Sequence, residues 1–73
     1  MPCVNADGTP TESGRRMLRA LKSGAVSPEE IARHAALPVF LVRSGLRDVI
    51  NANLVVRQGD VYQITDRAAE MAG

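Results

Sequence analysis

Arginine is the residue type in this chain best suited to binding chemistry, because every one of its nine basic residues except Lys22 is an arginine. The planar guanidinium group can donate two parallel hydrogen bonds to one phosphate or carboxylate, which a lysine ammonium group cannot do. Spacings of three and four residues in the middle of the chain place Phe40, Arg43, Ser44 and Arg47 on one face of an expected helix. An exposed Phe40 would therefore sit among cations.

The total charge does not identify a partner. Nine basic residues oppose eight acidic ones, so the net charge is +1 and the pI is about 8.0. A dedicated nucleic-acid-binding domain is usually far more basic. The placement of the arginines therefore matters more than their sum.

Residue patterns typical of enzymes and metal sites are missing from the sequence. Cys3 is the single cysteine, which excludes an intrachain disulfide, and we expect it to be an incidental, exposed thiol. His34 has no acidic or cysteine partner nearby in sequence, so a surface imidazole is expected. Glycine-rich phosphate loops, metal-ligand triads and nucleophile motifs do not occur. We predict that the protein is not an enzyme and has no cofactor.

The first predicted helix begins at a capping box, Thr9-Pro10-Thr11-Glu12, with Pro10 at the first helical position. Its buried face is predicted from apolar spacings of three and four: Gly14, Met17, Leu18, Leu21 and Ala25. Arg15, Arg19 and Lys22 lie on the opposite face and are best explained as solvated, although a contact surface is the alternative. Residues 1–8 are expected to be disordered.

A second capping box, Ser27-Pro28-Glu29-Glu30, predicts a short second helix that stops before Leu37-Pro38, since proline disfavours the α conformation in the preceding residue. Glu29 and Glu30 are explained by that box and by the helix dipole. A third helix is predicted over about residues 38–52, with Asn53 at its end because asparagine tolerates positive φ. Its buried face would comprise Val39, Val42, Leu46, Val49 and Ile50.

The last part of the chain changes to a β pattern. Two β-branched, apolar runs at residues 54–57 and 61–64 flank Gln58-Gly59-Asp60, which predicts a hairpin. Thr65 can cap a short helix over residues 66–72. The predicted fold is therefore α+β and mostly α, with residues 9–73 forming one domain. No run of apolar residues is long enough to span a membrane, and the default location is the cytoplasm.

The order of these motifs resembles a known family. IARHAALPVFLVRSGLRDVINANLV, from Ile31 to Val55, is similar to the helix-turn-helix of winged-helix transcription regulators of the MarR and ArsR kind. GDVYQITDRA, at residues 59–68, is similar to that family's Gly-x-x-Tyr-x-Leu-Thr-x-x-Gly wing motif. The resemblance extends over nearly everything from Thr9 onward.

The resemblance implies a winged helix-turn-helix domain that binds double-stranded DNA in transcription regulation. The third helix would lie in the major groove and the hairpin would act as the wing. By position, the DNA-contacting candidates are Val39, Phe40, Arg43, Ser44 and Arg47 on the helix and Arg57 on the wing. Family members usually act as dimers, but the last helix here is short for a dimer arm, so a homodimer through another surface and a larger protein partner both stay open.

The run LPVFLV at residues 37–42 departs from the family pattern, in which residues 39–41 are usually polar. Three interpretations compete. Phe40 could close the small core; Val39, Phe40 and Leu41 could form an apolar anchor for a protein partner, without DNA binding; or Phe40 could touch the bases, where an apolar side chain can contact only groups such as the thymine methyl.

Overall fold

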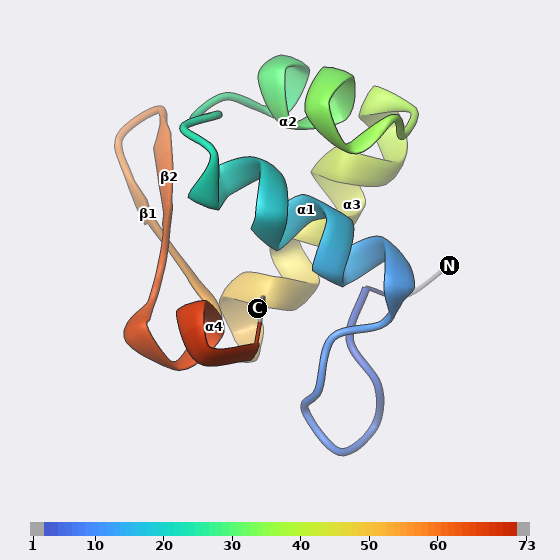
Figure 1. The fold of residues 1–73 in the computed structure, drawn as a ribbon, viewed down its shortest axis with the longest axis vertical. Helices are drawn as coiled ribbons and strands as arrows, with labels where there is room; N and C mark the ends of the chain where they lie inside the picture. Colours follow the sequence, from blue (N-terminus) through green and yellow to red (C-terminus); the bar gives the residue numbers. More distant parts are fainter. Residues whose placement is uncertain (1–2, 72–73) are drawn as a thin grey trace.

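The computed structural model describes residues 3–71, and six elements follow one another along that part of the chain. They are α1 (Glu12–Lys22), α2 (Pro28–Ala35), α3 (Val39–Asn51), β1 (Val55–Gln58), β2 (Val61–Ile64) and α4 (Asp66–Met71). Helix α1 packs against α2, α3, α4 and β2, while the β1–β2 hairpin stands at one side of the helices (Figure 1). This is the α+β, mostly α layout that the sequence predicts.

The core is aliphatic and is built from the apolar faces of the three long helices and β1. On α1, the predicted residues Gly14, Met17, Leu18 and Leu21 are all buried. On α3, Val42, Leu46 and Val49 are buried as predicted, Ile50 is partly buried, and Val39 is exposed. No buried polar side chain occurs among residues 3–71.

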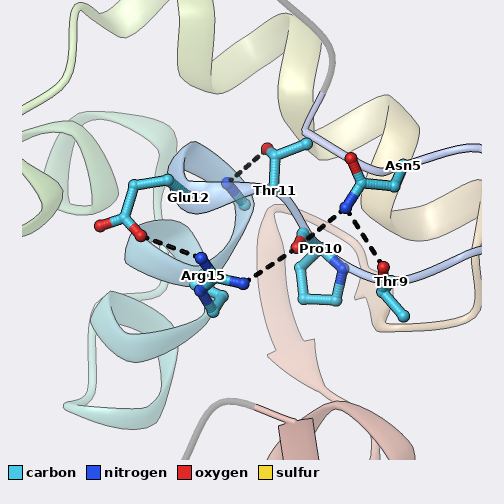
Figure 2. A network of polar contacts seen from close by, with 7 residues as sticks. Asn5, Thr9, Pro10, Thr11, Glu12 and Arg15 are labelled. Atoms are coloured by element: carbon cyan, nitrogen blue, oxygen red, sulfur yellow. Dashed lines mark hydrogen bonds and ion pairs between the residues drawn. The ribbon is translucent and has the colours of Figure 1, made fainter.

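Helix α1 begins two residues later than the predicted capping box at Thr9. Its N-cap is Thr11, whose Oγ1 accepts a hydrogen bond from the Gly14 N–H at 3.3 Å. Glu12 instead pairs with Arg15, which also donates to the carbonyl oxygen of Pro10 (Figure 2). Thr9 instead takes part in the turn before α1, where its N–H and its hydroxyl both donate hydrogen bonds to the Asp7 carboxylate.

The segment that precedes α1 is packed rather than loose from residue 3 onward, which differs from the expected disorder of residues 1–8. Val4 and Pro10 form an antiparallel bridge, and Asn5 donates to Thr9 and to the Pro10 carbonyl (Figure 2). Residues 1 and 2 lie outside the described part of the chain. The predicted exposed thiol is wrong, because Cys3 is completely buried.

Two glycines leave room for this N-terminal segment. A β-carbon at Gly14 would overlap the carbonyl oxygen of Cys3, and one at Gly45 would overlap the Cys3 sulfur and approach the Met17 sulfur to 2.9 Å. The Cys3 N–H also donates to the Asp48 carboxylate at 3.3 Å. Cys3 therefore fills the junction of α1 and α3, and burial is the main cause that raises the pKa of its thiol.

The predicted boundaries of α2 and the end of α3 are confirmed. Ser27 and Glu30 form the complete capping box in front of α2. Helix α2 ends at Ala35, and its C-cap, Ala36, has the left-handed conformation with a φ of 56°. Pro38 then precedes α3. Asn53 follows α3 with a φ of 62°.

The hairpin and the last helix also form as predicted, except that β1 begins one residue later than the predicted 54–57, and residue 72 of the predicted helix 66–72 lies outside the described residues. Strands β1 and β2 are antiparallel, with Val55 opposite Ile64 and Gln58 opposite Val61. Gly59 in the turn has a φ of 63°, which glycine adopts without strain. Thr65 Oγ1 accepts from the Ala68 N–H at the start of α4. Among the described residues, none of the helices has the length and apolar character that crossing a membrane requires.

Candidate nucleic-acid interface

Helix α3 is held by one face and exposes the other. Val42 and Val49 are completely buried against α2 and the rest of the core, and the short turn at residues 36–38 fixes the angle between α2 and α3. Arg43, Ser44 and Arg47 lie on the side that faces solvent. The face predicted from three-and-four spacing is therefore the accessible one.

Phe40 belongs to this exposed face. Its side chain is 73% exposed, Val39 is 39% exposed and Leu41 is partly buried, whereas Val42 is 0% exposed. The interpretation of Phe40 as a core residue is therefore wrong. The physical reason is the helical period: Phe40 lies on the solvent-facing side of α3 with Arg43 and Arg47, while Val42, Leu46 and Val49 face the core.

Three arginines converge on one hollow between α3 and the hairpin. This hollow, which we call the α3 groove, has a volume of about 260 Å³. Its lining residues are Arg43, Leu46, Arg47, Ile50, Asn51, Arg57 and Tyr62. The structure thus brings Arg57 of the hairpin to the same site as Arg43 and Arg47 of α3, and no carboxylate lines the groove among the described residues.

The three arginines differ in how firmly they are held. Arg57 donates through Nε to the Gly59 carbonyl oxygen at 2.8 Å, and its guanidinium carbon lies 6.0 Å from the centre of the Tyr62 ring. That arrangement orients Arg57 through the turn and an aromatic face. Arg47 makes no side-chain hydrogen bond or ion pair with any described residue, so its donors are available to a ligand.

Arg43 is held by an acidic residue of α2. Its Nη2 atom lies 2.8 Å from Glu29 Oε2, and both side chains are largely exposed. The Glu29 pKa is held below its ordinary value of 4.5, first by a hydrogen bond from its own backbone N–H at the start of α2 and then by the bond from Arg43. Because the pair is exposed, its free-energy contribution is small and a competing phosphate can replace it.

Some predicted residues lie outside the α3 groove, and some groove residues were not predicted. Val39, Phe40 and Ser44 are exposed on α3 but do not line it. Asn51 and Tyr62 line it although neither was a site candidate. Tyr62 could have been suspected only from the register of the hairpin, since it stands opposite Arg57 in the β1–β2 ladder.

Comparison with known proteins supports the fold and nothing finer. No family model matches the chain, and no curated protein matches it either. Among solved structures, it is similar to an O-methyltransferase (NcsB1) from neocarzinostatin biosynthesis, solved in complex with S-adenosyl-L-homocysteine. The TM-score is 0.71 at 23% identity, over 81% of this chain but only 20% of that enzyme. The chain thus spans about a fifth of the enzyme's length.

Proposed function

We propose that this protein binds double-stranded DNA through α3 and the hairpin, as a winged helix-turn-helix module of the kind that transcription regulators use. Helix α3 would enter the major groove and the hairpin would act as the wing. Affinity would come mainly from arginine contacts to phosphates, because apolar side chains such as Phe40 can offer little hydrogen-bonded base recognition.

The observation that carries this proposal is the convergence of Arg43, Arg47 and Arg57 on the α3 groove. The three residues come from two elements that are separated in sequence, and no described carboxylate lines the groove between them. Arg47 is unpaired and the ion pair of Arg43 is exposed, so at least two of the three can exchange their present surroundings for phosphates. The motif resemblance from Ile31 to Val55 supports the same site independently.

A pair of substitutions tests the site. Duplex binding should weaken when Arg43 and Arg47 are both replaced by alanine. The negative slope of log affinity against log salt should also become less steep by about two, because each lost phosphate contact removes nearly one unit. The double variant Arg33→Ala, Arg67→Ala is the control matched in charge, since both are exposed arginines outside the α3 groove. Equal effects from both variants would show nonspecific charge attraction instead.

A second candidate function is protein interaction through the start of α3, and the exposure of Phe40 favours it. An aromatic side chain that is 73% exposed, next to an exposed Val39, is a suitable anchor for a partner's pocket. The fold is compatible with either role, because a fold does not by itself determine a function. In this alternative, Val39, Phe40 and Leu41 would form the contact surface.

The same variants separate the two candidates. DNA binding predicts a large loss from the Arg43 and Arg47 substitutions and a smaller one from Phe40→Ala. Protein interaction predicts the reverse, measured as loss of self-association in sedimentation or of a partner in a pull-down. The two readouts can be collected on the same purified variants.

A further inference from the structure

A second hollow lies between α1 and the C-terminal end of α2. This α1–α2 hollow has a volume of about 260 Å³ and shares no lining residue with the α3 groove. Its polar lining side chains are Arg16 and Arg19 of α1, Ser23 after α1, and His34 of α2. Three alanine residues, Ala20, Ala35 and Ala36, complete it.

The two arginine side chains of this hollow have no counter-charge. Arg16, Arg19 and His34 make no side-chain hydrogen bond or ion pair with any described residue, and no carboxylate lines the hollow. Arg15, the direct neighbour of Arg16, shows the contrast because it pairs with Glu12 at 3.1 Å. Arg16 and Arg19 are three residues apart on one helical face, a spacing at which like charges repel each other and destabilise the helix.

Helix dipoles explain only part of this arrangement. Arg19 lies in the last turn of α1, where a cation is favoured by the negative end of the dipole. Arg16 lies a full turn earlier. The α1 C-terminus is also already capped by the Ser23 and Gly24 N–H groups, so it does not need the guanidinium of Arg16 as a donor.

We propose that the α1–α2 hollow binds a phosphate group. Two guanidinium groups can each present a pair of donors to the oxygens of a phosphate, which is the geometry that arginine matches best. The Ser23 hydroxyl and the His34 imidazole supply further donors at the rim. A doubly charged oxyanion also removes the repulsion between Arg16 and Arg19, which chloride or a single carboxylate does less well.

The volume of the hollow is larger than one phosphate ion needs, so the phosphate group can be part of a larger molecule. The small alanine side chains leave space for a compact organic group beside it. The same chemistry has two sources: a small phosphorylated molecule, or a phosphate of a DNA backbone that reaches beyond the α3 groove. The binding of a phosphate group itself does not depend on the DNA-binding proposal.

The test is a titration of the ¹⁵N-labelled protein with inorganic phosphate, at constant ionic strength set with sodium chloride and constant pH. We expect saturable chemical-shift changes at Ser23, His34 and Ala36 and at the side-chain Nε–H of Arg16 and Arg19. Half-saturation is expected at about 1–10 mM, because solvent-exposed charge contacts are weak. The double variant Arg16→Gln, Arg19→Gln should weaken phosphate binding at least fivefold, and Arg67→Ala should leave it unchanged.

The outcomes either support or overturn the assignment. Linear, unsaturated shifts, shifts confined to the α3 groove, or an unchanged titration in the double variant would each overturn it. Arg19 would then serve only to complement the dipole at the end of α1. If phosphate binding is lost in the double variant, a duplex titration then identifies the source. If the slope of log affinity against log salt is less steep by about two in the double variant than in the wild type, the phosphate belongs to DNA. An unchanged slope, or no DNA binding by either the wild type or the double variant, indicates a small phosphorylated molecule.

Discussion

Phe40 and Val42 are two residues apart on α3 and have opposite environments. Phe40 is 73% exposed and Val42 is completely buried. Replacing Phe40 by alanine should therefore change the free energy of unfolding by no more than about 0.5 kcal/mol. Val42→Ala should lower it by about 2 kcal/mol, from lost burial and the cavity left behind. Urea denaturation measures both, and a loss at Phe40 as large as at Val42 would place the ring in the core.

Glu29 sets how freely Arg43 can reach a ligand. Glu29→Gln removes a negative charge from the neighbourhood of the α3 groove and weakens the 2.8 Å contact with Arg43. If the groove binds DNA, this substitution should strengthen duplex binding by no more than about threefold, because exposed ion pairs are weak. Anisotropy titrations at one salt concentration would show it. Weaker binding would mean that Glu29 positions Arg43 for DNA instead of competing with it.

At the scale of elements, the start of α2 depends on one hydroxyl group. Ser27 Oγ accepts from the Glu30 N–H at 3.2 Å, and Glu30 in turn accepts from the Ser27 N–H at 3.3 Å. Ser27→Ala should lower the free energy of unfolding by about 1 kcal/mol. Ser27→Gly should cost only a few tenths, because glycine is also tolerated at an N-cap. Equal losses in thermal or urea unfolding would argue against a capping role for the hydroxyl.

The same capping box predicts a dependence of stability on pH. The Glu30 pKa lies below its ordinary value of 4.5, mainly because of the hydrogen bond from the Val26 N–H, followed by the bond from Ser27. A carboxyl with a lowered folded-state pKa stabilises the fold above its unfolded pKa and loses that effect as pH falls through the folded value. Glu30→Gln should therefore flatten the decrease in stability below about pH 4.5, measured by urea unfolding at several pH values. A wild-type slope in that variant would contradict the prediction.

Gly14 keeps α1 compatible with the N-terminal segment. Alanine there gains about 1 kcal/mol in helix propensity, but its β-carbon would overlap the Cys3 carbonyl, and overpacking typically costs about 1–3 kcal/mol. That carbonyl is fixed by a hydrogen bond from the Thr11 N–H at 3.0 Å, so it cannot move freely. We expect Gly14→Ala to destabilise the full chain.

A truncated background provides the control for Gly14. In a chain that begins at Thr11, the Cys3 carbonyl and the Pro10 β-carbon, which lies 3.2 Å from a β-carbon at position 14, are both gone. The same substitution should then stabilise the protein by up to about 1 kcal/mol. Urea unfolding of the wild type and Gly14→Ala in both the full and the truncated chain separates two effects: the contact between residue 14 and the N-terminal segment, and the helix propensity of alanine. If the effect of Gly14→Ala has the same sign in both backgrounds, the N-terminal segment does not pack on α1 in solution.

Local signals in the sequence were sufficient for most elements. Ser27-Pro28 fixed the start of α2, Leu37-Pro38 its end, and Gly59 the hairpin turn, because each acts through its own backbone conformation. The start of α1 was misplaced since Thr9 and Thr11 both offer a capping hydroxyl two residues apart. The choice between them depends on tertiary contacts, namely the bridge from Val4 to Pro10 and the turn bound to Asp7.

At the scale of the whole molecule, the candidate site was only partly predictable. The helical period was enough to put Arg43 and Arg47 on one exposed face. Arg57 meets Arg43 and Arg47 from 14 and 10 residues away in sequence, and the ion pair between Glu29 and Arg43 joins residues 14 apart. No local pattern encodes these contacts. The burial of Cys3 likewise depends on Gly45 and Met17 from two different helices.

Binding of duplex DNA to the α3 face through phosphates makes affinity depend on salt. A fluorescence anisotropy titration of mixed-sequence duplex DNA with the full chain at several salt concentrations would test this binding. Three arginines per copy predict a slope of log affinity against log salt near −3 for a single copy and near −6 for a dimer, with affinity in the micromolar range at low salt. No binding at low salt, or binding that is independent of salt, would contradict DNA binding by the α3 face and favour a protein partner at Phe40.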